Sequence, residues 1–197
     1  MKGGRDAIVK AATEIFAQKG FTGASTREIC TAAGITKPVL YYHFRSKEHL
    51  YQELMIDCFS RQRKTMLRAS KMRGSLRDRL IRTLYNDFQE VKKNRASTEL
   101  FVRMIFAPEE EHPPVDYIKE MEDQRGIIAA IFQEGVDAGE LVGEPHRLAT
   151  VFMGVSTIAI LENFFTGRNT LTRRSAERFI DIILHGCGRE KPLYRSV

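Results

Sequence analysis

The 197-residue chain contains no tryptophan, only six prolines and only three cysteines. Cys30, Cys58 and Cys187 are odd in number and lack the paired spacing of metal-binding cysteines. The sequence therefore indicates neither a disulfide framework nor a zinc site. Reduced thiols are typical of the cytoplasm, where we expect this chain to act. Inert packing is favoured over redox sensing as their role.

Long hydrophobic runs are also missing. The longest run without a charged residue covers the fourteen positions 148–161, whereas a membrane-spanning helix needs about 20 apolar residues. The N-terminal residues are amphipathic and of mixed charge, which differs from a secretory signal. The sequence therefore predicts a protein without a membrane partner.

Catalytic and metal-binding signatures are absent too. The segment Gly154–Ile158 lacks the second glycine of a nucleophile elbow, and Gly186–Gly188 follows an expected helix rather than the strand of a dinucleotide-binding loop. The five histidines are scattered without HExxH spacing. The adjacent carboxylates of Glu109–Glu111, beside His112, do not converge on one ion. We therefore expect no catalytic residue, no metal and no cofactor, and a protein that is not an enzyme.

Apolar residues recur at helical spacing along most of the chain, and the alternation typical of β-strands does not occur. The pattern predicts an all-α protein of about nine helices. Their expected positions are 7–19, 25–33, 37–44, 47–73, 76–93, 98–107, 115–137, 145–165 and 172–186.

Positive charge is concentrated in the first half of the chain. The formal net charge is +6 overall, with +4 in residues 1–50, +6 in residues 51–100, −7 in residues 101–150 and +3 in the remainder. A basic half suits a partner that carries phosphate groups, but basic runs also occur as solvated helix faces. The charge alone leaves both interpretations open.

The segment 25–50 carries the strongest local signals. Ser25 is a good N-cap, and Glu28 three residues later completes a capping box. Gly34 ends this helix, because glycine adopts the left-handed conformation at little cost. Pro38 fits the first turn of the next helix, where its missing N–H is harmless. Two short helices joined by a glycine turn form a helix-turn-helix, whose second helix would read DNA.

The second helix of this motif has sorted faces. Leu40 and Phe44 lie four residues apart and are expected to pack inward. The side chains left to face outward are those of Lys37, Val39, Tyr41, Tyr42 and His43. This combination suits DNA, since the polar groups reach phosphates while apolar groups touch a thymine methyl.

Two hydroxyl residues are expected to cap helices here, Thr36 before the second helix of the motif and Ser46 before the long helix that follows. Lys47 stands at the start of that long helix, against the usual preference for acidic residues. A phosphate bound by the helix N-terminus and by Lys47 explains this placement.

These residues together resemble the tetracycline-repressor (TetR) family of bacterial regulators. The matching string is Ser25-x-Arg27-Glu28-Ile29, Ala33-Gly34-Ile35-Thr36-Lys37, Leu40-Tyr41-Tyr42-His43-Phe44 and Ser46-Lys47-Glu48-x-Leu50, with Ala11-Ala12-x-x-x-Phe16-x-x-x-Gly20-Phe21 upstream. The resemblance implies a DNA-binding domain over residues 1–62 and an effector-binding and dimerisation domain over residues 63–197. It also implies a homodimer and a small-molecule effector.

We therefore expect a DNA-binding transcriptional regulator, a repressor that a small apolar or aromatic effector releases from a palindromic operator. The expected contacts to double-stranded DNA are Thr26, Arg27, Thr36, Lys37, Pro38, Val39, Tyr41, Tyr42, His43 and Lys47. The alternative is a helical small-molecule carrier without sequence-specific DNA binding. The exposed tyrosine–histidine cluster argues against that alternative.

The remaining expectations concern the larger domain. Candidate residues for an effector pocket are Phe59, Met66, Phe88, Phe101, Met104, Tyr117, Met121, Ile128, Phe132 and Phe152. Each of them also fits ordinary core packing, while methionine and aromatic side chains suit an adaptable apolar site. The two late apolar helices are candidates for the dimer interface, with Phe152, Ile158, Phe165, Phe179 and Ile183.

Overall fold

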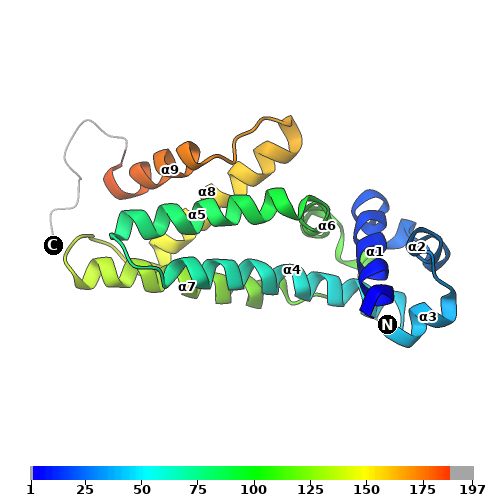
Figure 1. The fold of residues 1–197 in the computed structure, drawn as a ribbon. Coiled ribbons are helices and arrows are strands. Elements are labelled where there is room, and N and C mark those ends of the chain that lie inside the picture. Colours follow the sequence, from blue (N-terminus) through cyan, green and yellow to red (C-terminus); the bar gives the residue numbers. More distant parts are fainter. Residues whose placement is uncertain (1, 187–197) are drawn as a thin grey trace. The chain divides into compact units, whose positions relative to one another are not determined.

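A computed structural model describes residues 2–186 of the chain (Figure 1). This part contains nine α-helices, one short 3₁₀ helix and no β-strand, which confirms the predicted all-α class. The elements are α1 (Lys2–Gly23), α2 (Thr26–Ala33), α3 (Lys37–His43), α4 (Lys47–Ser70), α5 (Leu76–Lys93), α6 (Arg95–Phe106), the 3₁₀ helix η1 (Glu109–Glu111), α7 (Tyr117–Asp137), α8 (Pro145–Thr166) and α9 (Arg173–His185).

The predicted helices form, with differences at their ends. The expected end of the first helix at Gly20 coincides with a break in helical geometry (φ 73°, ψ 176°). Helical conformation then resumes and continues to Gly23. The helix expected to begin at residue 98 begins at Arg95 instead. Between the helices expected at 98–107 and 115–137, the chain forms the 3₁₀ helix η1, which the sequence did not predict.

The contacts of the chain divide it into two compact units. The first comprises the described residues up to Lys64 together with Glu90–Met121, and the second comprises Thr65–Gln89 and the described residues from Glu122 onward. The contacts therefore group residues 90–121 with the N-terminal helices, whereas the expected division at residue 62 assigned them to the second domain. The assignment of DNA binding to residues 1–62 and of effector binding to residues 63–197 stays a prediction.

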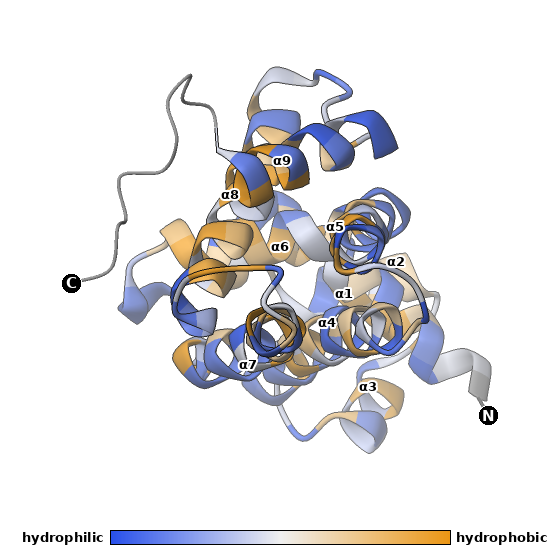
Figure 2. Cartoon of the chain, turned by 90° about the vertical axis from the view of Figure 1, so that its left-hand side faces the viewer, coloured by the Kyte–Doolittle hydropathy of each residue, from blue (hydrophilic) through white to orange (hydrophobic). Residues whose placement is uncertain are grey.

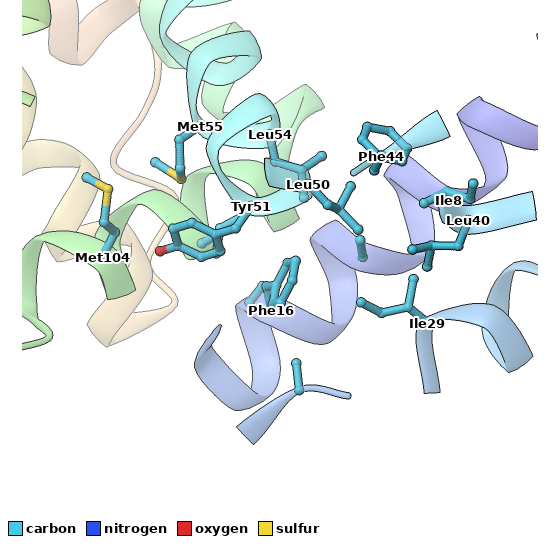
Figure 3. Close-up of a cluster of buried hydrophobic side chains, with 14 of the residues drawn as sticks. Ile8, Phe16, Ile29, Leu40, Phe44, Leu50, Tyr51, Leu54, Met55 and Met104 are labelled. Atoms are coloured by element: carbon cyan, nitrogen blue, oxygen red, sulfur yellow. The ribbon is translucent and has the colours of Figure 1, made fainter. Parts of the chain in front are cut away.

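The first unit has a core to which α1, α2, α3, α4 and α6 all contribute (Figure 3). Leu40 and Phe44 are fully buried, which confirms the inward face predicted for the motif. In Figure 3, Leu40 lies beside Ile8 of α1. Burying one such side chain contributes about 1.5–3 kcal/mol. The other large core residues are Phe16, Ile29, Leu50, Tyr51, Leu54, Met55, Phe59, Leu100 and Met104.

The second unit has its own core, built from α5, α7, α8 and α9. Phe132 and Phe152 meet edge to face with ring centroids 6.4 Å apart. A buried polar pair lies within this unit, where the Ser156 hydroxyl donates to Asp87 Oδ2 over 2.7 Å. Figure 2 shows the hydrophobic composition of α8 and the mixed composition of α9.

Candidate nucleic-acid interface

The start and end of α2 form as predicted. The Glu28 amide donates to Ser25 Oγ over 3.2 Å, and the Ser25 amide donates to Glu28 Oε2 over 3.0 Å, which completes the capping box. Hydrogen bonds from Lys19 and Ser25 lower the pKa of the Glu28 carboxyl to about 2. Gly34 takes the left-handed conformation (φ 65°) and donates its N–H to carbonyls of the last turn. These groups fix the angle at which the chain leaves α2 for α3.

The start of α3 differs in one detail from the prediction. Thr36 occupies the N-cap position, but its side chain makes no capping hydrogen bond, so the expected hydroxyl cap is wrong. An N-cap side chain bonds the N–H of the second or third helical residue. Pro38 is the second residue and has no N–H, which removes one of these two donors. The Thr36 side chain is exposed and available to a partner.

The outer face of α3 carries the residues that the sequence placed there. Val39, Tyr41 and Tyr42 are exposed by 38%, 48% and 72%. Lys37 and Pro38 are also exposed, and His43 is half-buried. Burial of Leu40 and Phe44 on the opposite side explains this sorting. Such a face presents hydroxyl, ammonium and small apolar groups together, the set that contacts phosphates and base edges.

A side chain of α1 contacts the C-terminal end of α3. The Arg5 guanidinium lies 5.2 Å from the ring centroid of Phe44 and pairs with Glu53 over 2.5 Å. The His43 ring meets that of Tyr42 edge to face at 5.1 Å. Sequence analysis missed Arg5, since its partner Glu53 lies 48 residues away and no local pattern links the two.

The flanks of α3 add further polar groups. Arg27 of α2 is exposed and Thr26 is half-buried at the start of that helix. Arg45, which the sequence interpretation did not include, is exposed in the short connection between α3 and α4. Ser46 caps α4 as predicted, because the His49 amide donates to Ser46 Oγ over 3.1 Å. The exposed cations Arg27, Lys37 and Arg45 suit a polyanionic partner.

Lys47 has partners that the sequence interpretation did not include. Its Nζ donates to the carbonyl oxygens of Phe21 and Ala24, each over 3.0 Å, and lies 4.1 Å from the Phe21 ring centroid. The expected place of Lys47 was an open helix N-terminus facing a phosphate. The observed contacts are intramolecular, because the connection between α1 and α2 passes over the start of α4.

The expected effector-pocket residues fall into both units. In the first unit, the rings of Phe59, Phe101 and Tyr117 contact one another with centroids 5.4–6.3 Å apart, and Met104 is buried. Met121 is 38% exposed, so it is not part of that packed group. The pocket residues of the second unit are all buried, namely Met66, Phe88, Ile128, Phe132 and Phe152.

The expected interface residues divide by exposure. Ile158 and Phe165 of α8 are 65% and 74% exposed, and Phe179 and Ile183 of α9 are half-buried. Phe152 is fully buried, so its placement at an interface is wrong, and it belongs to the core beside Phe132. Helical periodicity on an apolar helix did not distinguish its two faces.

The length and apolar composition of α8 would also allow it to cross a membrane, and 28% of its most apolar stretch is buried. Core helices of soluble proteins can have the same length and apolar composition. Exposed apolar side chains on such a helix equally suit a face covered by another protein chain.

Two cysteines lie in the described part of the chain. Cys30 packs into the core of the first unit, and burial raises the pKa of its thiol. A raised pKa leaves less of the reactive thiolate. Cys58 is half-buried, and Cys187 lies outside the described residues. Among residues 2–186, no group of three or more metal-ligating side chains comes together.

A sequence model for the bacterial regulatory proteins of the tetR family matches residues 8–54, the stretch that forms α1 to α3 and the start of α4. This N-terminal stretch belongs to the TetR family. Among curated relatives, the uncharacterised HTH-type transcriptional regulator YdgC of Bacillus subtilis is 43% identical over 60 residues, which cover 30% of this chain and 31% of YdgC. The HTH-type transcriptional repressor KstR2 of Rhodococcus jostii is 24% identical over 93% of this chain and 91% of its own length.

Solved structures show the same TetR fold over nearly the whole chain. A Clostridium perfringens protein described as a fatty acid metabolism regulator superposes with a TM-score of 0.80 at 19% identity. The match covers 93% of this chain and 100% of that protein. FadR of Bacillus subtilis, solved in complex with stearoyl-CoA, has a TM-score of 0.75 at 14% identity with the same coverage. The chain spans about a third to a half of the length of the first curated relatives it matches, at 31% and 55%.

Proposed function

We propose that this chain is a DNA-binding transcriptional regulator that represses its target genes and leaves its operator when a small apolar or aromatic effector binds. The observation that carries this proposal is the face of α3, where Tyr41 and Tyr42 are exposed while Leu40 and Phe44 anchor the helix in the core. These two neighbouring tyrosines keep about half or more of their surface exposed. They suit a partner that offers both phosphates and base edges.

The polar and apolar groups of α2 and α3 take different parts in binding. Lys37, Tyr42 and His43 contact phosphates. Four residues lie closest to base edges, namely Thr36, Pro38, Val39 and Tyr41. Thr26 and Arg27, at the start of α2, contact the phosphates of the opposite strand. Phosphate contacts set affinity and its salt dependence, whereas base contacts set sequence preference.

A palindromic operator requires a two-fold protein whose recognition helices lie about 34 Å apart. The apolar face of α8 with α9 is the surface we assign to a homodimer interface. Ile158 and Phe165 are the exposed anchors of this face, and Phe179 and Ile183 border it. Large exposed apolar side chains on neighbouring helices favour a protein partner over a solvated surface.

The effector class rests on the apolar side chains of the candidate pocket residues, which lie on α4 and on the helices after it. Phenylalanine and methionine suit an apolar or aromatic ligand. The stearoyl-CoA bound to FadR contains a long apolar chain and fits this class. The effector acts by preferring a conformation whose recognition helices do not match the operator, since a ligand shifts an equilibrium only through its differential affinity.

The experiment that tests this function is selection of genomic DNA fragments by the purified full-length protein, with affinity followed against salt concentration. A palindromic consensus supports a dimeric regulator, and the genes beside it narrow the effector class. Weak binding without sequence preference that is lost at moderate salt contradicts the proposal. It then favours the alternative, a helical small-molecule carrier.

A further inference from the structure

The end of α1 is held from two sides by cationic side chains. Gly20 breaks the helix with φ 73°, a conformation that suits glycine, and helix ends leave carbonyl groups without helical donors. Arg103 of α6 donates to two such carbonyls. Its Nε lies 2.9 Å from the Ala17 oxygen, and its Nη2 lies 3.1 Å from the Gln18 oxygen.

Lys47 of α4 holds the next part of the chain. Its ammonium donates to the carbonyl oxygens of Phe21 and Ala24 over 3.0 Å each and covers the ring of Phe21. An ammonium has three N–H donors, and two are used here. Lys47 and Arg103, together called the α1 clamp, thus bind four carbonyl groups between residues 17 and 24.

The ring beneath Lys47 is itself fixed. Phe21 stacks on Phe16 at 5.9 Å and meets Tyr51 edge to face at 5.3 Å, and both of those rings are buried. The ammonium therefore rests on a rigid aromatic group and not on a mobile loop. Moving Lys47 toward a phosphate would break two charge-assisted hydrogen bonds and a cation–π contact.

The position of the recognition helix depends on this region. Ala24 directly precedes Ser25, the N-cap of α2, and α2 leads through the Gly34 turn into α3. We propose that Lys47 and Arg103 are positioning residues for DNA binding, which fix the end of α1 and through it α2 and α3, without contacting DNA. This inference rests on the proposed function for its DNA readout.

The test compares Lys47→Met with a matched control, Lys37→Met. Both lysines lie at the first position of a helix, but Lys37 is exposed and is assigned to a phosphate. Affinity for a selected operator fragment is measured against salt, well below the unfolding temperature of each variant. Loss of charge-assisted hydrogen bonds should weaken operator binding by Lys47→Met about tenfold. The salt slope should stay unchanged in Lys47→Met and fall by about one in Lys37→Met.

Two results overturn the assignment of Lys47. A salt slope reduced as much as in Lys37→Met places Lys47 on a phosphate. If the fully folded Lys47→Met protein binds the operator with wild-type affinity, Lys47 contributes only to stability and does not position α2 and α3.

Substitutions of Arg103 test the α1 clamp independently of Lys47. Arg103→Met should lower operator affinity at an unchanged salt slope, and Arg103→Lys should recover only part of the loss, since one ammonium does not reproduce the fork of a guanidinium. Full recovery in Arg103→Lys would show that charge alone matters and would contradict the clamp.

Amide hydrogen exchange on the protein without DNA separates the clamp from the proposed function. Exchange at residues 21–26 should become about tenfold faster in Lys47→Met, because broken hydrogen bonds make local opening easier. Unchanged protection in both Lys47→Met and Arg103→Met would overturn the clamp even if the wild-type protein selects a palindrome. Faster exchange in a protein that selects no DNA would instead reject only the proposed function.

Discussion

Leu40 and Tyr42 stand two positions apart on α3, and shortening each to alanine should separate folding from DNA binding. Leu40 is 0% exposed and Tyr42 is 72% exposed. A buried leucine replaced by alanine loses about 2–5 kcal/mol, since its transfer energy disappears and a cavity remains. A surface substitution changes stability by about 0.5 kcal/mol or less.

These free energies convert into measurable shifts in melting temperature. For a chain of this size, about 1 kcal/mol corresponds to 2–4 °C. Leu40→Ala should therefore lower the melting temperature by about 6–12 °C for a mid-range loss of 3 kcal/mol. Tyr42→Ala should move it by about 2 °C at most. Thermal unfolding followed by circular dichroism measures both.

The two substitutions should affect operator affinity in the opposite order, with the larger loss in Tyr42→Ala. Tyr42→Ala removes the hydroxyl that we propose to bind a phosphate, and it should weaken operator binding about tenfold. Leu40→Ala keeps every outward-facing group and should retain most of its affinity when fully folded. Fluorescence anisotropy with a selected operator fragment at a temperature below both transitions measures this. A Tyr42→Ala protein with wild-type affinity would refute the assignment of the outer face of α3 to DNA.

Further predictions concern sequence reading, assembly and acid stability. Val39→Ala should change the preference among operator sequences while leaving the salt slope intact, as measured by competition between related fragments. Ile158→Asp should convert a dimer into a monomer in sedimentation at micromolar concentration, with Arg173→Ala on α9 as a surface control. An unaltered dimer would remove α8 from the interface. Glu28 has a folded-state pKa of about 2, below its ordinary value of 4.5. Its contribution to stability is therefore full above pH 4.5 and lost as the pH falls toward 2, so acid unfolding of Glu28→Gln should depend less steeply on pH in this range.

The parts of the fold that could be predicted are those fixed by neighbouring residues. Ser25 with Glu28 gave the start of α2, Gly34 gave its end, and the spacing of Leu40 and Phe44 gave the buried side of α3. Each of these features depends on residues within four positions of one another. The hydroxyl cap by Thr36 was wrong although it is local, because Pro38 removes one of the donors that such a cap requires.

The contacts that could not be predicted join distant parts of the chain. Lys47 binds carbonyls 26 and 23 residues upstream, and Arg103 binds carbonyls 86 and 85 residues upstream. Backbone carbonyls carry no residue-specific pattern, so no spacing in the sequence points to them. For the same reason the grouping of α6 with the N-terminal helices could not be foreseen. Phe152 shows the limit of periodicity, because an apolar helix offers hydrophobic residues on every side.

The exposed apolar residues of α8 have a consequence for biosynthesis. This helix starts at Pro145, so it leaves the ribosome after the helix-turn-helix and the core helices α4 to α7. The first unit ends at Met121, so at a synthesis rate of about 5–20 residues per second it has about 1–5 seconds in which to fold before α8 begins to appear. The exposed apolar side chains of α8 thus appear only after the first unit has had time to fold, which shortens the time available for aggregation.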